Sequence, residues 1–365
     1  MTAKLVWENL KHRPLRSLLS FLLIGVPVTL ILTLVGLTHG MIQDFQERQR
    51  GSGADIMVRG TNAATALSFS SASLLEGFVN FFQKQPHVRV ATGILNHSYE
   101  TFLTITGIDL AQFDEMTGGF KYLEGGRFQQ PDDVIIDHYF AAERHLQVGR
   151  PIMLLNRSWR VCGIIEGGHL SHIFVQLKVL QDLDSATGKV SQILLKLDSA
   201  ANTQTVIQAL KDQMPEYPIY SMEEFTSLVS VNNVAGLREF TWVVVGLGVV
   251  IGAVVVWMSM YMAVLMRTRE IGILKSLGGS DSFILGIVVL EALLLGAGGT
   301  VLGILMSFGA QWLIRALVPA SIQMAIVPVW WPIALGIMLA SAALGAIYPG
   351  LSAARHDPIE ALAYE

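Results

Sequence analysis

The stretch that decides the fold is Arg267-Thr268-Arg269-Glu270-Ile271-Gly272-Ile273-Leu274-Lys275-Ser276-Leu277-Gly278, a charged segment between two long apolar runs. The run before it, residues 240–266, carries no charge, and the run after it, residues 282–311, carries only Glu291. Charged side chains are costly in hydrocarbon, and twelve residues are too few to form a domain. The segment is therefore predicted to be a tight connection between two membrane-spanning helices.

The composition is that of an integral membrane protein. Of the 365 residues, 52% are hydrophobic and only 15% are charged, and the mean hydropathy is +0.49. Soluble domains carry about 25% charged residues. The net charge of −4 and the absence of a long basic run argue against a nucleic-acid partner.

Four runs are long enough to cross a membrane, which takes about 20 apolar residues. They are residues 17–38, 240–266, 282–311 and 332–354. The first could also be read as a signal peptide. It is longer than a signal-peptide core of roughly 7–15 residues, and no clean cleavage site follows it, so we expect a retained helix.

Positive charges in the short flanking segments predict the orientation. Lysine and arginine cluster before the first run (Lys4, Lys11, Arg13, Arg16), after the second (Arg267, Arg269, Lys275) and after the fourth (Arg355). The segment between the third and fourth runs has only Arg315. Because such charges favour the cytoplasmic side, both termini and segment 267–281 are expected in the cytoplasm, with residues 41–239 outside.

Residues 41–239 read as an α+β domain inserted between the first and second spans. Short runs rich in β-branched residues predict strands at 54–59, 88–95, 101–108, 133–136, 151–155, 159–165, 173–177 and 192–197. Helical patterns occupy 72–84, 137–145 and 202–214, and a helix over 223–238 is expected to continue into the second span as a stalk. The glycines of 124–126 and 166–168 mark turns, and 61–73 reads as a loose surface segment. The chain thus divides at residues 1–40, 41–239 and 240–365.

Sites for chemistry are sparse. A phosphate-binding loop, a Gly-x-Ser-x-Gly elbow and a His-Glu-x-x-His motif are all missing from the sequence, so we expect no catalytic residue and no nucleotide site in this chain. His169 and His172 could hold a metal or haem on one helical turn, but they follow Gly167-Gly168 and a loop is the expected setting. The single Cys162 excludes an internal disulfide and is expected to serve packing.

Polar and small residues within the spans indicate helix packing. Glu291 is the sole acid of its run, and a carboxylate there usually faces a polar partner. A proton relay is the alternative, but it would need further ionisable groups within the spans. The pairs Gly248/Gly252 and Gly299/Gly303 have the spacing that lets helices approach closely, for packing or dimerisation.

The combination of these parts resembles the FtsX/MacB family of ABC transporter permeases, the type VII or mechanotransmission class. One span, a large external domain and three further spans, with segment 267–278 after the second span, follow the pattern of that family. Residues 7–19 resemble its amphipathic N-terminal helix, and residues 291–296 and 349–362 resemble the start of its third span and its C-terminal tail. Residues 106–109, 124–128, 146–149 and 159–165 resemble parts of the MacB-like periplasmic core.

The resemblance implies a subunit of the bacterial cytoplasmic (inner) membrane that works as a pair with two cytoplasmic ATPase subunits. The ATPase would be a separate chain that binds ATP and Mg, and it would dock on Arg267, Arg269, Glu270, Ile271, Gly272, Ile273, Leu274, Lys275, Leu277 and Gly278. ATP-driven motion would then reach the external domain, and substrate would be exported or extracted from the outer leaflet or periplasm. The resemblance leaves open whether the pair is a homodimer or contains a paralogue, and whether a periplasmic adaptor takes part.

A second function class fits the same architecture. A non-transporting regulator would use the same motion to activate an extracytoplasmic enzyme. A third class, a membrane-bound enzyme, has no candidate site in the sequence.

Overall fold

The computed structural model describes residues 14–60, 74–100, 103–230, 233, 236–317 and 324–355. The predicted N-terminal helix up to residue 13, the segment 61–73 and the tail beyond residue 355 lie outside the described residues. The chain divides into two units. The helical unit contains residues 14–39, 236–317 and 324–355, and the α+β unit contains residues 40–230 and 233.

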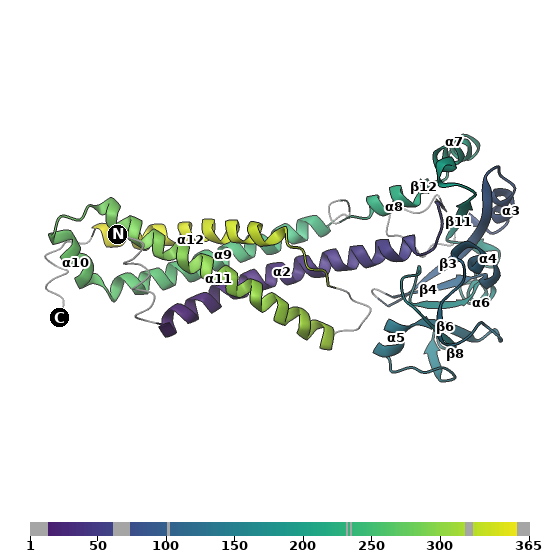
Figure 1. The fold of residues 1–365 in the computed structure, drawn as a ribbon, viewed down its shortest axis with the longest axis horizontal. Coiled ribbons are helices and arrows are strands. Elements are labelled where there is room, and N and C mark those ends of the chain that lie inside the picture. Colours follow the sequence, from purple (N-terminus) through teal and green to yellow (C-terminus); the bar gives the residue numbers. More distant parts are fainter. Residues whose placement is uncertain are drawn as a thin grey trace. The chain divides into compact units, whose positions relative to one another are not determined.

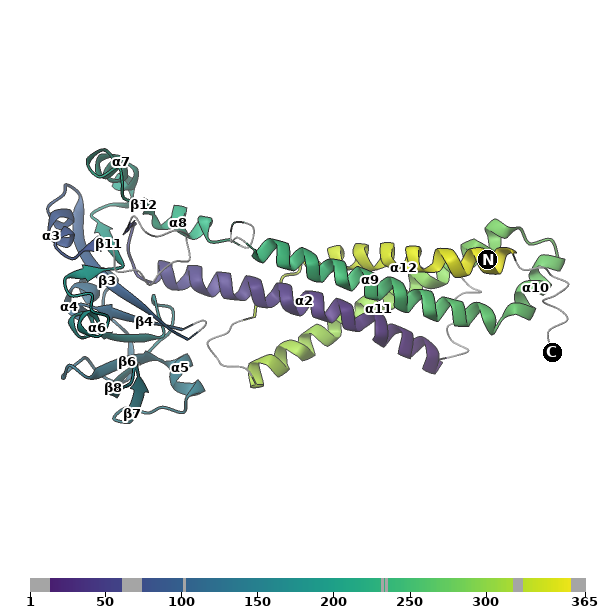
Figure 2. The ribbon, with the colours of Figure 1, turned by 180° about the vertical axis from the view of Figure 1, so that it is seen from behind.

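Four long helices dominate the helical unit, as Figure 1 and the reverse view in Figure 2 show. They are α2 (Pro14–Arg50), α9 (Leu237–Leu265), α11 (Asp281–Leu317) and α12 (Trp330–Arg355). Each is long and apolar enough to cross a membrane, which confirms the four predicted spans. Helix α2 ends at Arg50, well beyond the predicted run, and its residues from Gly40 onward belong to the α+β unit.

Small residues bring these helices together. The buried core of the helical unit includes Ile24 and Val28 of α2, Val256 and Met260 of α9, Ala292 and Leu295 of α11, and Met338, Ala342 and Ala346 of α12. A lipid environment gives little hydrophobic drive for helices to associate, so close backbone approach at alanine and glycine supplies the van der Waals contact instead.

The predicted glycine pairs lie at helix contacts within the unit. A Cβ atom added at Gly299 would lie 2.6 Å from Cβ of Ile24, and one added at Gly303 would lie 2.6 Å from Cβ of Val28. Thr29 of α2 donates through Oγ1 to the carbonyl of Gly303 at 3.0 Å. The other pair faces different neighbours, with Gly248 against Ile31 and Gly252 against Met338.

A mixed sheet forms the centre of the α+β unit. Its strand order is β12-β1-β11-β3-β4-β9-β6-β8-β5, with β7 paired to β8. These strands are β1 (Ile56–Arg59), β3 (Val88–Glu100), β4 (Leu103–Ile108), β5 (Tyr122–Gly125), β6 (Asp133–Asp137), β7 (Pro151–Leu154), β8 (Arg157–Ile165), β9 (Ile173–Gln176), β11 (Gln192–Leu197) and β12 (Ile219–Ser221). Strand β3 pairs with β11 through its first half and with β4 through its second, so it joins the two halves of the sheet. A separate pair is formed by β2 (Leu74–Leu75) and β10 (Lys189–Val190).

Both faces of the sheet are covered, which explains why several strands read as uninterrupted apolar runs. In β1, Ile56 and Val58 enter one core while Met57 enters the other. The first core also receives side chains from α3 (Phe78–Gln83), α5 (His138–Glu143), α6 (Leu177–Leu183) and α7 (Thr203–Gln213). The second receives them from α4 (Leu110–Thr117), α8 (Met222–Leu228) and the end of α2.

The predicted stalk helix is wrong. Helix α8 ends at Leu228 and α9 begins at Leu237, so residues 223–238 do not form one continuous helix. Gly236 precedes α9 in the left-handed conformation with φ of +82°, which no continuous helix contains. The predicted helix at 72–84 is also too long, because β2 occupies its start and α3 begins only at Phe78.

Candidate coupling site in the α9–α11 connection

The connection between α9 and α11 folds into a short helix, α10 (Thr268–Ser276). Glu270 lies in its first turn and Lys275 in its last, which complements the helix dipole. The helix ends in a Schellman motif: the N–H of Gly278 donates to Lys275 O at 3.0 Å, and that of Gly279 donates to Leu274 O at 2.9 Å. Gly278 has φ of +92°, a conformation that favours glycine. The sequence Leu277-Gly278-Gly279 thus sets where α10 stops.

Helix α10 presents two different faces. Arg269, Glu270, Ile273 and Leu277 are exposed, and Leu277 keeps 80% of its surface accessible. Ile271, Gly272, Leu274 and Lys275 are buried or half-buried. The residues predicted as one coupling surface therefore separate into an exposed outer group and an inner group that packs against the helical unit.

An ion pair fixes the start of the connection. Arg267 donates from Nη1 to Oε2 of Glu291 at 3.2 Å, and the two side chains are only 13% and 10% exposed. The guanidinium supplies the polar partner that an acid in an apolar helix requires. The pair ties the end of α9 to α11, so Glu291 belongs to the same site as the predicted coupling residues.

A cavity of about 80 Å³, lined mostly by apolar side chains together with Arg267 and Glu291, lies beneath α10. Ile271 and Leu274 of α10 form one wall, and Glu270 lies at its edge. The other walls come from Met260, Ala263 and Val264 of α9 and from Ile284, Ile287 and Val288 of α11. The space between α10 and the two long helices is therefore incompletely filled.

Lys275 holds the other end of α10. Its ammonium group donates to the carbonyl of Ala354 at 2.5 Å and pairs with Asp281 at 3.1 Å. Asp281 is the first residue of α11, and Ala354 lies in the last turn of α12. The site therefore joins α10 to all three neighbouring helices. Asp281 is the last residue of the predicted segment 267–281, but the sequence did not identify Lys275 as its partner. Ala354 was missed because a backbone carbonyl carries no signal in the residue type.

The two histidines singled out in the sequence do not converge on one point. Residues 169–172 form a loop, as predicted. His169 donates from Nδ1 to Gly51 O at 2.9 Å, whereas His172 donates from Nδ1 to Oδ2 of Asp137 at 2.6 Å. The two imidazoles thus donate their Nδ1 protons to different protein groups.

Comparison with known proteins gives matches over both units. The family of MacB-like periplasmic core domains matches residues 17–213, and the FtsX-like permease C-terminal family matches residues 242–358. The uncharacterized ABC transporter permease MJ1507 of Methanocaldococcus jannaschii is 24% identical over 98% of this chain and 96% of its own length. The uncharacterized ABC transporter permease YknZ of Bacillus subtilis is 25% identical over 98% of this chain and 96% of its own.

A third relative is longer. The macrolide export ATP-binding/permease protein MacB of Hahella chejuensis is 26% identical over 99% of this chain but only 60% of its own length. Its name assigns ATP binding and permease functions to a single chain. MJ1507 and YknZ, which match over nearly their full length, are named as permeases only.

Proposed function

This chain belongs to the MacB/FtsX family of ABC transporter permeases, and we propose that it is the membrane subunit that a separate cytoplasmic ATPase drives. ATP and Mg would be bound by that ATPase. Its action would move the α+β unit on the outer side of the membrane and thereby export or extract a substrate from the outer leaflet or periplasm.

The observation that supports this function best is the division of α10 into two faces. Ile273 and Leu277 are 44% and 80% exposed although both are large and apolar. Exposed apolar side chains flanked by charge are typical of a protein interface. Glu270 lies on the same exposed side and adds a charge that a basic partner surface would complement. We infer that this outer face is the docking surface for the ATPase.

The inner face of α10 would pass the motion on. Arg267–Glu291 and Lys275–Asp281 connect α10 to α11, and Lys275 also binds α12. Nucleotide binding would favour one arrangement of the paired ATPases, and their contact with α10 would favour the matching arrangement of the helices. The strength of the coupling is then set by how much more the nucleotide-bound ATPase pair stabilises one arrangement of the helices than the other.

The assembly would contain two copies of the ATPase and a second permease subunit, either a copy of this chain or a paralogue. Both termini would lie in the cytoplasm, as the lysine and arginine distribution predicts. Lipid would surround the apolar surfaces of the four spans.

Co-purification from the native host tests this function. A tagged wild-type chain extracted in mild detergent should bring down an ATPase, whereas Leu277→Asp should lose it because a charge replaces an exposed apolar contact. The matched control is Leu123→Asp, which changes the same residue type in β5 of the α+β unit, where it is 51% exposed. Retention of the ATPase by Leu277→Asp, or its absence from the wild type, would contradict the proposal.

A further inference from the structure

The last turns of α2 are part of the fold of the α+β unit. Phe45 packs into the second core of that unit, and its ring lies 6.4 Å from that of Phe225 in α8. Gln46 donates from Nε2 to the carbonyls of Thr226 and Val229, both at 2.8 Å. A helix that begins in the apolar bundle therefore ends as a structural element of the sheet domain.

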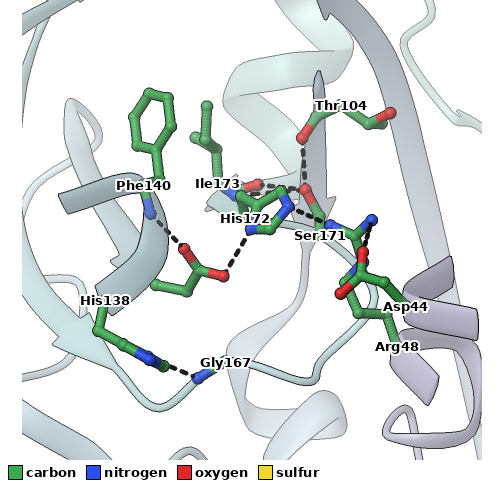
Figure 3. Close-up of polar contacts among 10 residues, drawn as sticks. Asp44, Arg48, Thr104, His138, Phe140, Gly167, Ser171, His172 and Ile173 are labelled. Carbon is green, nitrogen blue, oxygen red and sulfur yellow. Dashed lines mark hydrogen bonds and ion pairs between the residues drawn. The ribbon is translucent and has the colours of Figure 1, made fainter. Parts of the chain in front are cut away.

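A buried polar chain attaches the same turns to the strands. Arg48 pairs with Asp44 one turn earlier at 2.5 Å and donates from Nη1 to Nε2 of His172. His172 in turn contacts Asp137 at the end of β6. His172 and Asp137 are 3% and 1% exposed. Figure 3 shows the imidazole of His172 facing the guanidinium that α2 contributes.

The chemistry of the side chains determines which atom donates in each hydrogen bond of this polar chain. A guanidinium has only donors, so Nε2 of His172 must accept from Arg48. The proton of the imidazole is then on Nδ1, which donates to Asp137 Oδ2 at 2.6 Å. The other carboxylate oxygen of Asp137 accepts from the N–H of Phe140 at 2.9 Å and so caps α5.

Asp137 and His172 are also joined through the backbone. The N–H of Asp137 donates to the carbonyl of His172 at 3.0 Å, and Ser171 donates to the carbonyl of Thr104 in β4. The chain from α2 thus reaches β6 and β4 of the sheet, the loop before β9, and the helix α5 that follows β6.

Stability alone does not account for this arrangement. Replacing a buried ion-pair network with apolar residues of similar size is often neutral or stabilising, because charges lose their hydration on burial. What a directional hydrogen-bonded chain provides beyond apolar packing is a fixed register between two elements. Here the elements are the end of α2 and the strands of the α+β unit.

We propose that Asp44, Arg48, His172 and Asp137 form a joint, hereafter the α2 joint, that makes the α+β unit follow displacements of α2. The inference rests on the proposed function, because the displacement would originate from the ATPase. The four residues act through one another and are positioning residues; none of them is assigned contact with substrate.

The first test asks whether the joint holds α2, and it needs no ATPase. Hydrogen exchange is measured on the full chain in lipid nanodiscs. His172→Leu should raise exchange across residues 41–50 by about tenfold or more, as expected for losing a hydrogen bond to a charged group. His172→Gln should retain protection, because its amide can donate to Asp137 and accept from Arg48. Arg127→Leu, which breaks the ion pair with Asp114 elsewhere in the unit, is the matched control.

The second test asks whether the joint transmits motion. In the complex with its ATPase, nucleotide should change exchange at residues 133–143 of the wild type. His172→Leu and Arg48→Leu should keep ATPase binding and ATP hydrolysis but lose that response, and His172→Gln should restore it. Unchanged exchange at β1 and β11 shows that a variant is folded.

The two tests separate the two proposals. A wild-type nucleotide response in His172→Leu would overturn the joint and leave the proposed function intact. Failure of the wild type to bind an ATPase would contradict the proposed function, and exchange at residues 41–50 would then decide alone whether the joint holds α2. If neither His172→Leu nor Arg48→Leu altered exchange at residues 41–50, the α2 joint would be overturned.

Discussion

Arg267 and Glu291 are 24 residues apart in the sequence and form an ion pair of 3.2 Å between the end of α9 and the middle of the first half of α11. The two side chains are only 13% and 10% exposed, so water screens their charges little. Together with the contacts of Lys275 to Ala354 and Asp281, the pair joins the α9–α11 connection to the long helices.

Breaking this pair should destabilise the helical unit. Glu291→Leu leaves the guanidinium of Arg267 buried without its partner, and such changes cost about 3–5 kcal/mol. We expect a clearly lower Tm for the full chain in detergent. The double variant Arg267→Met/Glu291→Leu should recover most of the loss, since it removes both charges. Additive losses in the double variant would show that the two residues do not interact.

The α2–α11 crossing should be sensitive to a single methyl group. In Gly303→Ala the new Cβ would lie 2.6 Å from Cβ of Val28 and 2.8 Å from Gly25 O, so the helices must separate. Overpacking of this kind costs about 1–3 kcal/mol. Gly309→Ala in the same helix meets no atom within 4 Å and should be neutral or stabilising. Thermal unfolding of the two variants side by side measures the difference, and equal Tm values would contradict the crossing.

Cys162 should be a poor nucleophile in the folded protein. Burial, with a further contribution from the charge of Asp133, raises the pKa of its thiol to about 12. At pH 8 the thiolate fraction is then roughly a thousandfold below that of an ordinary cysteine. Alkylation by iodoacetamide, followed by mass spectrometry, should be slow in the native chain and fast after denaturation. Fast labelling of the native protein would be inconsistent with this setting.

Acid should weaken the α+β unit through Asp133. Burial by itself raises the pKa of this carboxyl, but hydrogen bonds from Arg160 at 2.8 and 2.9 Å and from the backbone N–H groups of Gln129 and Gln130 outweigh it and lower the pKa. The pKa is thus lower in the folded than in the unfolded chain. Its stabilising contribution is present above the unfolded value of 3.8 and is lost as the pH falls through the folded value.

The variant Asp133→Asn isolates this contribution. Urea unfolding of the full chain at about pH 5 and about pH 2.5 should show a smaller decrease in stability for the variant than for the wild type. An equal decrease would assign the acid sensitivity to other carboxylates.

Sequence patterns predicted the elements whose signal is local. The four spans follow from uninterrupted apolar length, and strands such as β6, β8 and β11 follow from runs of β-branched and aliphatic residues buried on both faces. Helix α4 was missed although Asp109 caps its start and Gly118 its end. Strand β5 was missed because Gly125 reads as a turn, whereas here it lies against the carbonyl of Cys162.

The site could be predicted only as a segment. Charge between two spans indicated α10, but its division into two faces depends on which side α9 and α11 cover. Glu291 was expected to have a polar partner, and only the fold identifies Arg267. The α2 joint could not be predicted from the sequence, because the fold of the sheet, and not spacing along the chain, brings Arg48, Asp137 and His172 together.

The strand order also governs when the α+β unit can be completed during synthesis. Strand β1, the first of the sheet, pairs with β12, the last, through Ile56 and Ser221. Nearly all of the unit must therefore leave the ribosome before its sheet can close, and contacts so distant in sequence form slowly. Leu237, where α9 begins, follows soon after. Closure of the sheet and insertion of the second apolar helix therefore fall in the same interval of translation, during which the strand edges are still unpaired.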